Sequence, residues 1–157
     1  MRIMLLFQVL LLFLSLEGAA RTAEAPLLGC WDTTDEELFV VFRDSDPKFL
    51  KVWVTILSRS ETPAKRGTCA WALGYDRCFF EAPEIFGKDY RVEMLKALLE
   101  DKDIMVRRCA IQACQSVLKP EAAVLLPVLE KMRNKEGVEG LEKKDIDDTI
   151  KIFGLIK

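Results

Sequence analysis

A motif that recurs after 41 residues restricts the fold of this chain more than any other feature of its sequence. The motif is an arginine followed by small or apolar residues at helical spacing. Its two copies are Arg66-x-x-Cys69-x-x-Ala72-Leu73 and Arg107-x-x-Ala110-x-x-Ala113-Cys114. One further period after the end of the second copy lie Gly154 and Leu155. A period of about 20 to 50 residues indicates stacked supersecondary units.

A more apolar helix is predicted before each copy, so the repeating unit is a pair of helices. The predicted first helices cover 47–59, 89–100 and 121–133, and the predicted second helices cover 62–74, 104–118 and 145–156. Asp46-Pro47 and Thr62-Pro63 are typical helix starts, with an N-cap residue before proline. In the first helix the residues that recur at helical spacing are Phe49, Leu50, Trp53, Ile56 and Leu57. Since no unit can bury its apolar face alone, the units must stack.

Three segments lie outside the predicted pairs. Residues 33–43 contain a capping box and an acidic first turn, which predict a short capping helix. Residues 75–88 hold a proline, a glycine and four aromatic residues, which predict an ordered loop. Residues 134–144 form a charged, glycine-containing linker. The only β-like run has five residues, so the chain is predicted to be all-α with roughly seven helices.

These residues resemble the HEAT family, whose repeats are helix pairs of about 40 residues. In that family the second helix begins with Val-Arg and continues through spaced alanines into Ala-Leu. Val106-Arg107 through Ala113-Cys114 matches this pattern well, and residues 64–74 match it moderately. The third unit departs from it, because Lys151 replaces a small residue and no arginine opens the helix. The resemblance implies an α-solenoid of about three helix pairs in a domain spanning 47–157.

The N-terminus has the three parts of a secretory signal peptide. Arg2 precedes an apolar stretch from Ile3 to Leu16, and small residues follow it up to Ala20. Fourteen residues at about 1.5 Å each fall short of the roughly 30 Å hydrocarbon core, so the stretch is a poor permanent anchor. We expect cleavage after Ala20, giving a signal peptide (1–20), an N-terminal segment (21–46) and a secreted or periplasmic protein. An uncleaved anchor or a buried N-terminal helix is the alternative.

All five cysteines follow the predicted signal peptide, and export would bring them into an oxidising compartment. Cys69, Cys109 and Cys114 fall within helical patterns and are expected to be buried as small apolar residues. A disulfide between Cys30 and Cys78 is the pairing that their loop positions suggest. Cys30 also ends a sequence similar to a bacterial lipobox, although three charged residues separate it from the apolar stretch.

Several chemistries are excluded by composition. The chain has no histidine, which removes histidine-dependent catalysis and histidine metal sites. Its formal net charge of −2 is unchanged by loss of residues 1–20, since Arg2 and Glu17 leave together. Such a balance predicts no nucleic-acid partner and no attraction to anionic membranes. No phosphate-binding loop is present, and Ile150 stands where a calcium loop beginning at Asp145 would require glycine. We therefore predict no cofactor, no metal and no enzymatic activity.

Two groups of residues are candidates for a binding site. Arg66 and Arg107 occupy equivalent positions and would form either a basic strip for an acidic partner or a set of bonds to acids at the turns. Phe79, Phe80 and Phe86 lie in the aromatic loop, which would form either a contact site or a lid over the core.

The predicted function is therefore a non-catalytic protein-interaction or scaffold module that binds through a helical-repeat surface. The resemblance offers an alternative, because some members of the similar phycobilisome-lyase-like group attach pigments to proteins. That alternative is a lyase-associated or assembly-factor role. Self-association is also expected through an uncapped end repeat near Phe153 and Leu155.

Overall fold

The computed structural model describes residues 38, 46–75, 83–87 and 89–155. Within these ranges the chain forms seven helices and no strand, which confirms the prediction of an all-α protein. The helices are α3 (Pro47–Leu57), α4 (Pro63–Tyr75), α6 (Pro83–Phe86), α7 (Tyr90–Leu99), α8 (Ile104–Cys114), α9 (Lys119–Arg133) and α10 (Gly140–Leu155). None of the described helices is long and apolar enough to cross a membrane.

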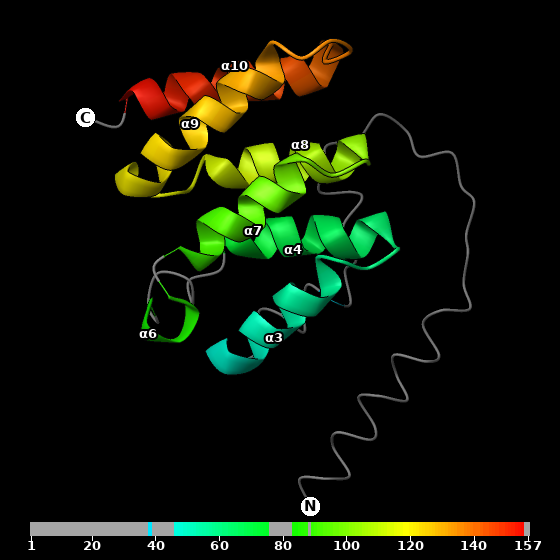
Figure 1. Ribbon diagram of the computed structural model, residues 1–157, viewed down its shortest axis with the longest axis vertical. Helices are drawn as coiled ribbons and strands as arrows, with labels where there is room; N and C mark the ends of the chain where they lie inside the picture. Colours follow the sequence, from blue (N-terminus) through cyan, green and yellow to red (C-terminus); the bar gives the residue numbers. More distant parts are fainter. Residues whose placement is uncertain (1–37, 39–45, 76–82, 88, 156–157) are drawn as a thin grey trace, which may run out of the picture.

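The helix pairs follow one another through the molecule in sequence order, and the short helix α6 lies near α3 (Figure 1). α3 and α4 lie at one end, α7 and α8 in the middle, and α9 and α10 at the other end. α8 contacts both α4 and α10, whereas α7 contacts α9. The buried apolar residues form one continuous cluster that runs through all three pairs. Leu38, the one described residue of the predicted capping helix, is helical and belongs to this cluster.

Two of the predicted helix starts carry the capping bond that their sequences indicate. The carboxylate of Asp46 accepts a hydrogen bond from the backbone N–H of Lys48 at 2.9 Å, just before Pro47 begins α3. Asp103 accepts from the N–H groups of Met105 and Val106 at 2.8 and 3.2 Å, which fixes the start of α8. Each bond satisfies donors that a helix leaves unpaired in its first turn. Asp89 stands before α7 but forms no such side-chain bond.

The contact between α4 and α8 depends on small residues. A Cβ atom on Gly74 would lie only 2.7 Å from the Cα atom of Ala113, which is closer than real Cβ atoms approach other atoms. The hydroxyl of Ser116 donates to the Gly74 carbonyl across the same contact. Ala110 and Ala113 are fully buried nearby. The small residues of the motif therefore serve the close packing that the sequence predicts.

Several predicted boundaries are wrong. The last helix begins at Gly140 rather than Asp145, because the linker of 134–144 contributes its final turn to α10. α8 ends at Cys114 rather than Leu118. The predicted loop 75–88 contains the single-turn helix α6. The predicted signal peptide 1–20, most of the capping helix and Cys30 lie outside the described residues.

Candidate protein-binding surface

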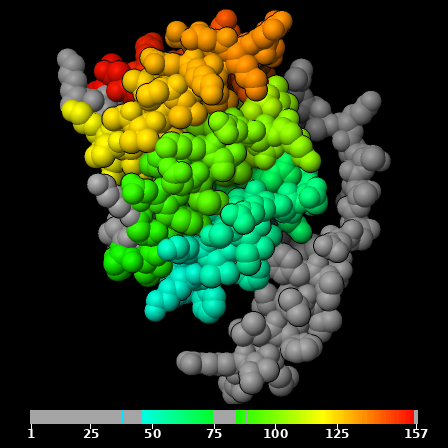
Figure 2. Space-filling view, in the orientation of Figure 1, coloured from blue at the N-terminus to red at the C-terminus, as the bar shows by residue number. Residues whose placement is uncertain are grey.

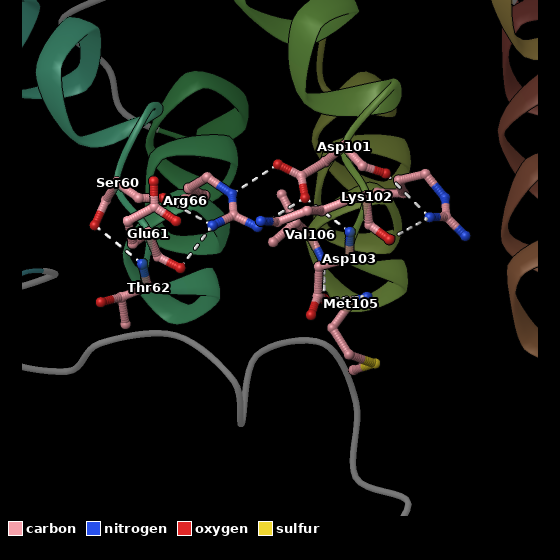
Figure 3. A network of polar contacts seen from close by, with 10 residues as sticks. Ser60, Glu61, Thr62, Arg66, Asp101, Lys102, Asp103, Met105 and Val106 are labelled. Carbon is pink, nitrogen blue, oxygen red and sulfur yellow. Dashed lines mark hydrogen bonds and ion pairs between the residues drawn. The ribbon is translucent and has the colours of Figure 1, made fainter. Parts of the chain in front are cut away.

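Arg66 on α4 forms four hydrogen bonds, two to the turn after α7 and two to the turn before α4 (Figure 3). Its Nε donates to Asp101 Oδ2 at 2.7 Å, and its Nη2 donates to Asp101 Oδ1 at 2.8 Å. Its Nη1 donates to the carbonyl oxygens of Ser60 and Glu61 at 2.7 and 3.1 Å. These two carbonyls belong to the turn between α3 and α4. One guanidinium group therefore closes a turn in its own pair and reaches the next pair.

Arg107 repeats this arrangement one period later. Its Nε and Nη2 donate to the two carboxylate oxygens of Glu142 at 2.6 and 3.0 Å. Its Nη1 donates to the carbonyl oxygens of Asp101 and Lys102 at 3.0 and 3.2 Å. Each of these partners lies 41 residues after the corresponding partner of Arg66. The 41-residue period therefore extends from the motif to the hydrogen bonds that join successive pairs.

Each of these two arginines pairs with a carboxylate within the stack. The hydrogen bonds that Arg66 donates to Asp101 raise the pKa of Arg66, and those that Arg107 donates to Glu142 raise the pKa of Arg107. Burial of Asp101 favours its neutral form, but the hydrogen bonds from Arg66 and the Asp103 N–H outweigh this effect and lower the pKa of Asp101. Arg66 is only 4% exposed, and the Arg107 side chain is 23% exposed. The geometry therefore favours the structural role for both arginines over a basic strip.

Two further arginines join the helix pairs, and sequence reasoning did not identify them. Arg91 on α7 pairs with Glu121 on α9, and its Nε donates to Glu121 Oε1 at 2.8 Å. Arg108 on α8 donates through Nε to Asp145 Oδ2 on α10 at 2.7 Å. Neither arginine has a counterpart one period earlier, where Leu50 and Gly67 stand. The repeat therefore gave no signal for them.

The described part of the aromatic loop closes one edge of the core. Phe86 is 4% exposed, and its ring centroid lies 5.8 Å from that of Tyr90. Lys51 on α3 donates to the Ile85 carbonyl at 2.7 Å, which fastens α6 to α3. The hydroxyl groups of Tyr90 and Thr55 lie 2.8 Å apart. Phe86 thus occupies the position expected of a lid, whereas Phe79 and Phe80 lie outside the described residues.

The helical cysteines are buried thiols, as their patterns predict. Cys69, Cys109 and Cys114 are all buried and are not in disulfides. Burial raises the pKa of Cys69 and raises that of Cys114 to about 12. A thiol in such surroundings is a poor nucleophile, because the thiolate is the reactive form. The predicted Cys30–Cys78 bridge involves two residues outside the described ranges.

One helix face in the described structure is both apolar and exposed. On α3 the side chains of Phe49, Val52 and Ile56 are 63%, 53% and 56% exposed, and they share one side of the helix. The sequence pattern includes Phe49 and Ile56 with the core residues Leu50 and Leu57, so it does not separate the two faces. We call this set of three residues the α3 stripe. In Figure 2 the cyan side chains of α3 lie at the end of the stack opposite α10.

The 41-residue register relates the stripe to α7. Phe49 lies one period before Tyr90, the residue through which α7 contacts Lys51 and Thr55 of α3. Val52 and Ile56 lie one period before Glu93 and Ala97, which are exposed on α7. Phe49 therefore holds a position that α7 uses to contact the preceding pair, whereas Val52 and Ile56 extend the exposed apolar face beyond that position.

Among known proteins, no family model, no curated sequence and no solved structure matches this chain.

Proposed function

We propose that this protein is a non-catalytic interaction or scaffold module, built as an α-solenoid of three HEAT-like helix pairs. The observation that carries the proposal is the α3 stripe, an exposed apolar face at the end of the stack. Apolar groups exposed together on one face are characteristic of protein-binding surfaces. The arginine bonds between pairs support a rigid platform for that face. The apolar N-terminus supports export of the module after loss of residues 1–20.

The proposal assigns no chemistry to the helical cysteines. Thioether attachment of a pigment requires a reactive thiolate, and the raised pKa values of Cys69 and Cys114 oppose its formation. In the described residues no group of three or more potential ligands could hold a metal ion. The raised pKa values of Cys69 and Cys114 are the observation that favours binding over thioether chemistry at these two residues.

The test compares proteins captured from the native compartment by the wild-type chain and by Val52→Glu. Val52 is exposed, so the substitution leaves the core intact and places a charge in the middle of the stripe. We expect at least one protein to bind the wild type stoichiometrically and to be lost from the variant. Val124→Glu is the matched control, since Val124 on α9 is 47% exposed at the other end of the stack. Equal capture by all three chains would refute binding through α3.

A further inference from the structure

The α3 stripe lies between groups of opposite charge. Asp46 precedes the stripe by one turn, and Arg59 follows it by about one turn. Both residues are exposed. The stripe itself has one strongly apolar side, since Phe49, Val52 and Ile56 are accompanied by Trp53 at its edge. An acid at one end and a base at the other give the helix a directional charge pattern.

This pattern is complementary to itself when two α3 helices run antiparallel. Centring such a pair between Val52 and Trp53 sets Phe49 opposite Ile56 of the second copy. The same register sets Val52 opposite Trp53 of the second copy. It also sets Asp46 opposite Arg59 of the second copy, so the acid of each chain meets the base of the other. A parallel pair would instead place like charges together at both ends.

From this complementarity we propose that the partner of the α3 stripe is a second copy of this chain, bound through an antiparallel α3–α3 contact. The inference rests on the proposed function, because it names the partner of the same surface. A twofold axis passes between the two Val52 side chains, and each chain contributes the same patch.

The other end of the stack is not suited to receive α3. Asp148 and Lys151 on α10 are exposed and stand one period after Arg107 and Ala110, which are positions used for contacts between pairs. Polar residues at these positions resemble the outer face of a capping repeat. Head-to-tail stacking would bury Asp148 and Lys151 against apolar residues, which costs free energy. The closed dimer avoids this cost.

The first experiment measures the mass of the purified full chain by sedimentation equilibrium from about 1 to 200 µM, because small interfaces give weak complexes. We expect a monomer–dimer equilibrium. Val52→Glu should weaken it by at least about 100-fold, since two carboxylates would meet at the axis. Arg59→Glu should weaken it by about three- to tenfold by setting acid against acid. At a concentration where the wild type is monomeric, each variant should melt at the wild-type temperature.

The second experiment is oxidative cross-linking. Val52→Cys places a thiol beside the twofold axis and should give a covalent dimer that the wild type does not form under the same oxidant. Val124→Cys, on α9 at the other end of the stack, is the control and should give none, since Val124 is 47% exposed. A chain that stays monomeric throughout, or a dimer that survives Val52→Glu, would overturn the dimer. If the chain is monomeric but Val52→Glu loses a different captured protein, only the dimer fails and the proposed function stands.

Discussion

α8 packs against α4 and against α10 through different kinds of residue. On the α4 side Gly74 lies against Ala113, and no room remains for even a methyl group. One period later Gln115 takes the place of Gly74, and its Nε2 donates to Thr149 on α10 at 3.1 Å. Thr149 donates in turn to the Ile111 carbonyl at 3.3 Å. The first contact therefore depends on small residues, whereas the second spans its helices with polar side chains.

The comparison shows that one repeat position can meet two different packing requirements. Lys151 departs from the small-residue pattern of the motif, yet α10 still packs on α8. Its side chain is exposed on the outer side of α10, where no further pair follows within the described residues. The packing of α10 on α8 therefore does not require a small residue at position 151.

The largest effects are expected at the two equivalent arginines. Arg66→Ala should lower the free energy of unfolding by about 3 to 4 kcal/mol, because it leaves Asp101 and two turn carbonyls without their donor in a mostly buried site. Arg107→Ala should cost about as much, because it leaves the carboxylate of Glu142, whose side chain is 1% exposed, without its donor. Urea titration measures both values. A loss below about 1 kcal/mol in either variant would contradict a buried ion pair at that contact.

The next effect is expected at Ala110, which is fully buried on α8. Ala110→Leu adds three carbon atoms to a packed contact and should lower stability by about 1 to 3 kcal/mol. Lys102→Ala, an exposed change in the preceding turn, should alter stability by less than about 0.5 kcal/mol. A neutral or stabilising Ala110→Leu, judged by melting temperature, would contradict close packing of the second helices.

Two glycines of α4 provide a matched pair. Gly74→Ala should lower stability by about 1 to 2 kcal/mol, because its methyl group meets backbone atoms of Ala113. Gly67→Ala should be neutral or stabilising by up to about 1 kcal/mol, because its Cβ would lie 3.5 Å from Cys109 Sγ and alanine favours the helix. If denaturant titrations gave the same change in the free energy of unfolding for both variants, α4 and α8 would be no closer at Gly74 than at Gly67.

The smallest effect is expected when the pH is lowered. The pKa of Asp101 is lowered in the folded chain, so its contribution is present above the unfolded pKa and is lost as the pH falls through the folded value. Wild-type stability should therefore decline below about pH 4. In Asp101→Asn the decline should be smaller by about 1 kcal/mol or less, because other carboxylates still titrate. Parallel pH profiles for the two proteins would rule out this contribution.

Much of the fold could be predicted because its determinants are local. Asp46 and Asp103 mark helix starts through bonds to N–H groups two or three residues away, and such bonds are encoded in short sequences. The partners of Arg66 and Arg107 depend on which turn faces which helix. Asp101 was among the acids available at the turns, but Glu142 fell in a segment predicted as linker. Adding one period to Asp101 would have identified it.

The α3 stripe could not be separated from the core by sequence, because both faces of α3 are apolar. Phe49 and Leu50 are adjacent in the chain, yet Phe49 is 63% exposed and Leu50 is fully buried. The bonds that Arg91 and Arg108 form between helix pairs could not be predicted either, because an arginine within an amphipathic helix is ordinarily assigned to its solvated face.

A double-mutant cycle on Arg107 and Glu142 tests most directly whether the 41-residue period joins the third pair to the second. The four chains are the wild type, Arg107→Ala, Glu142→Ala and the double variant, each unfolded in urea. We expect a coupling free energy of about 1 to 3 kcal/mol. Either single substitution already breaks both carboxylate bonds, so the second substitution has no such bond left to break. A coupling near zero would show that Glu142 does not bind Arg107, and the repeated arginine contact would then end at Arg66.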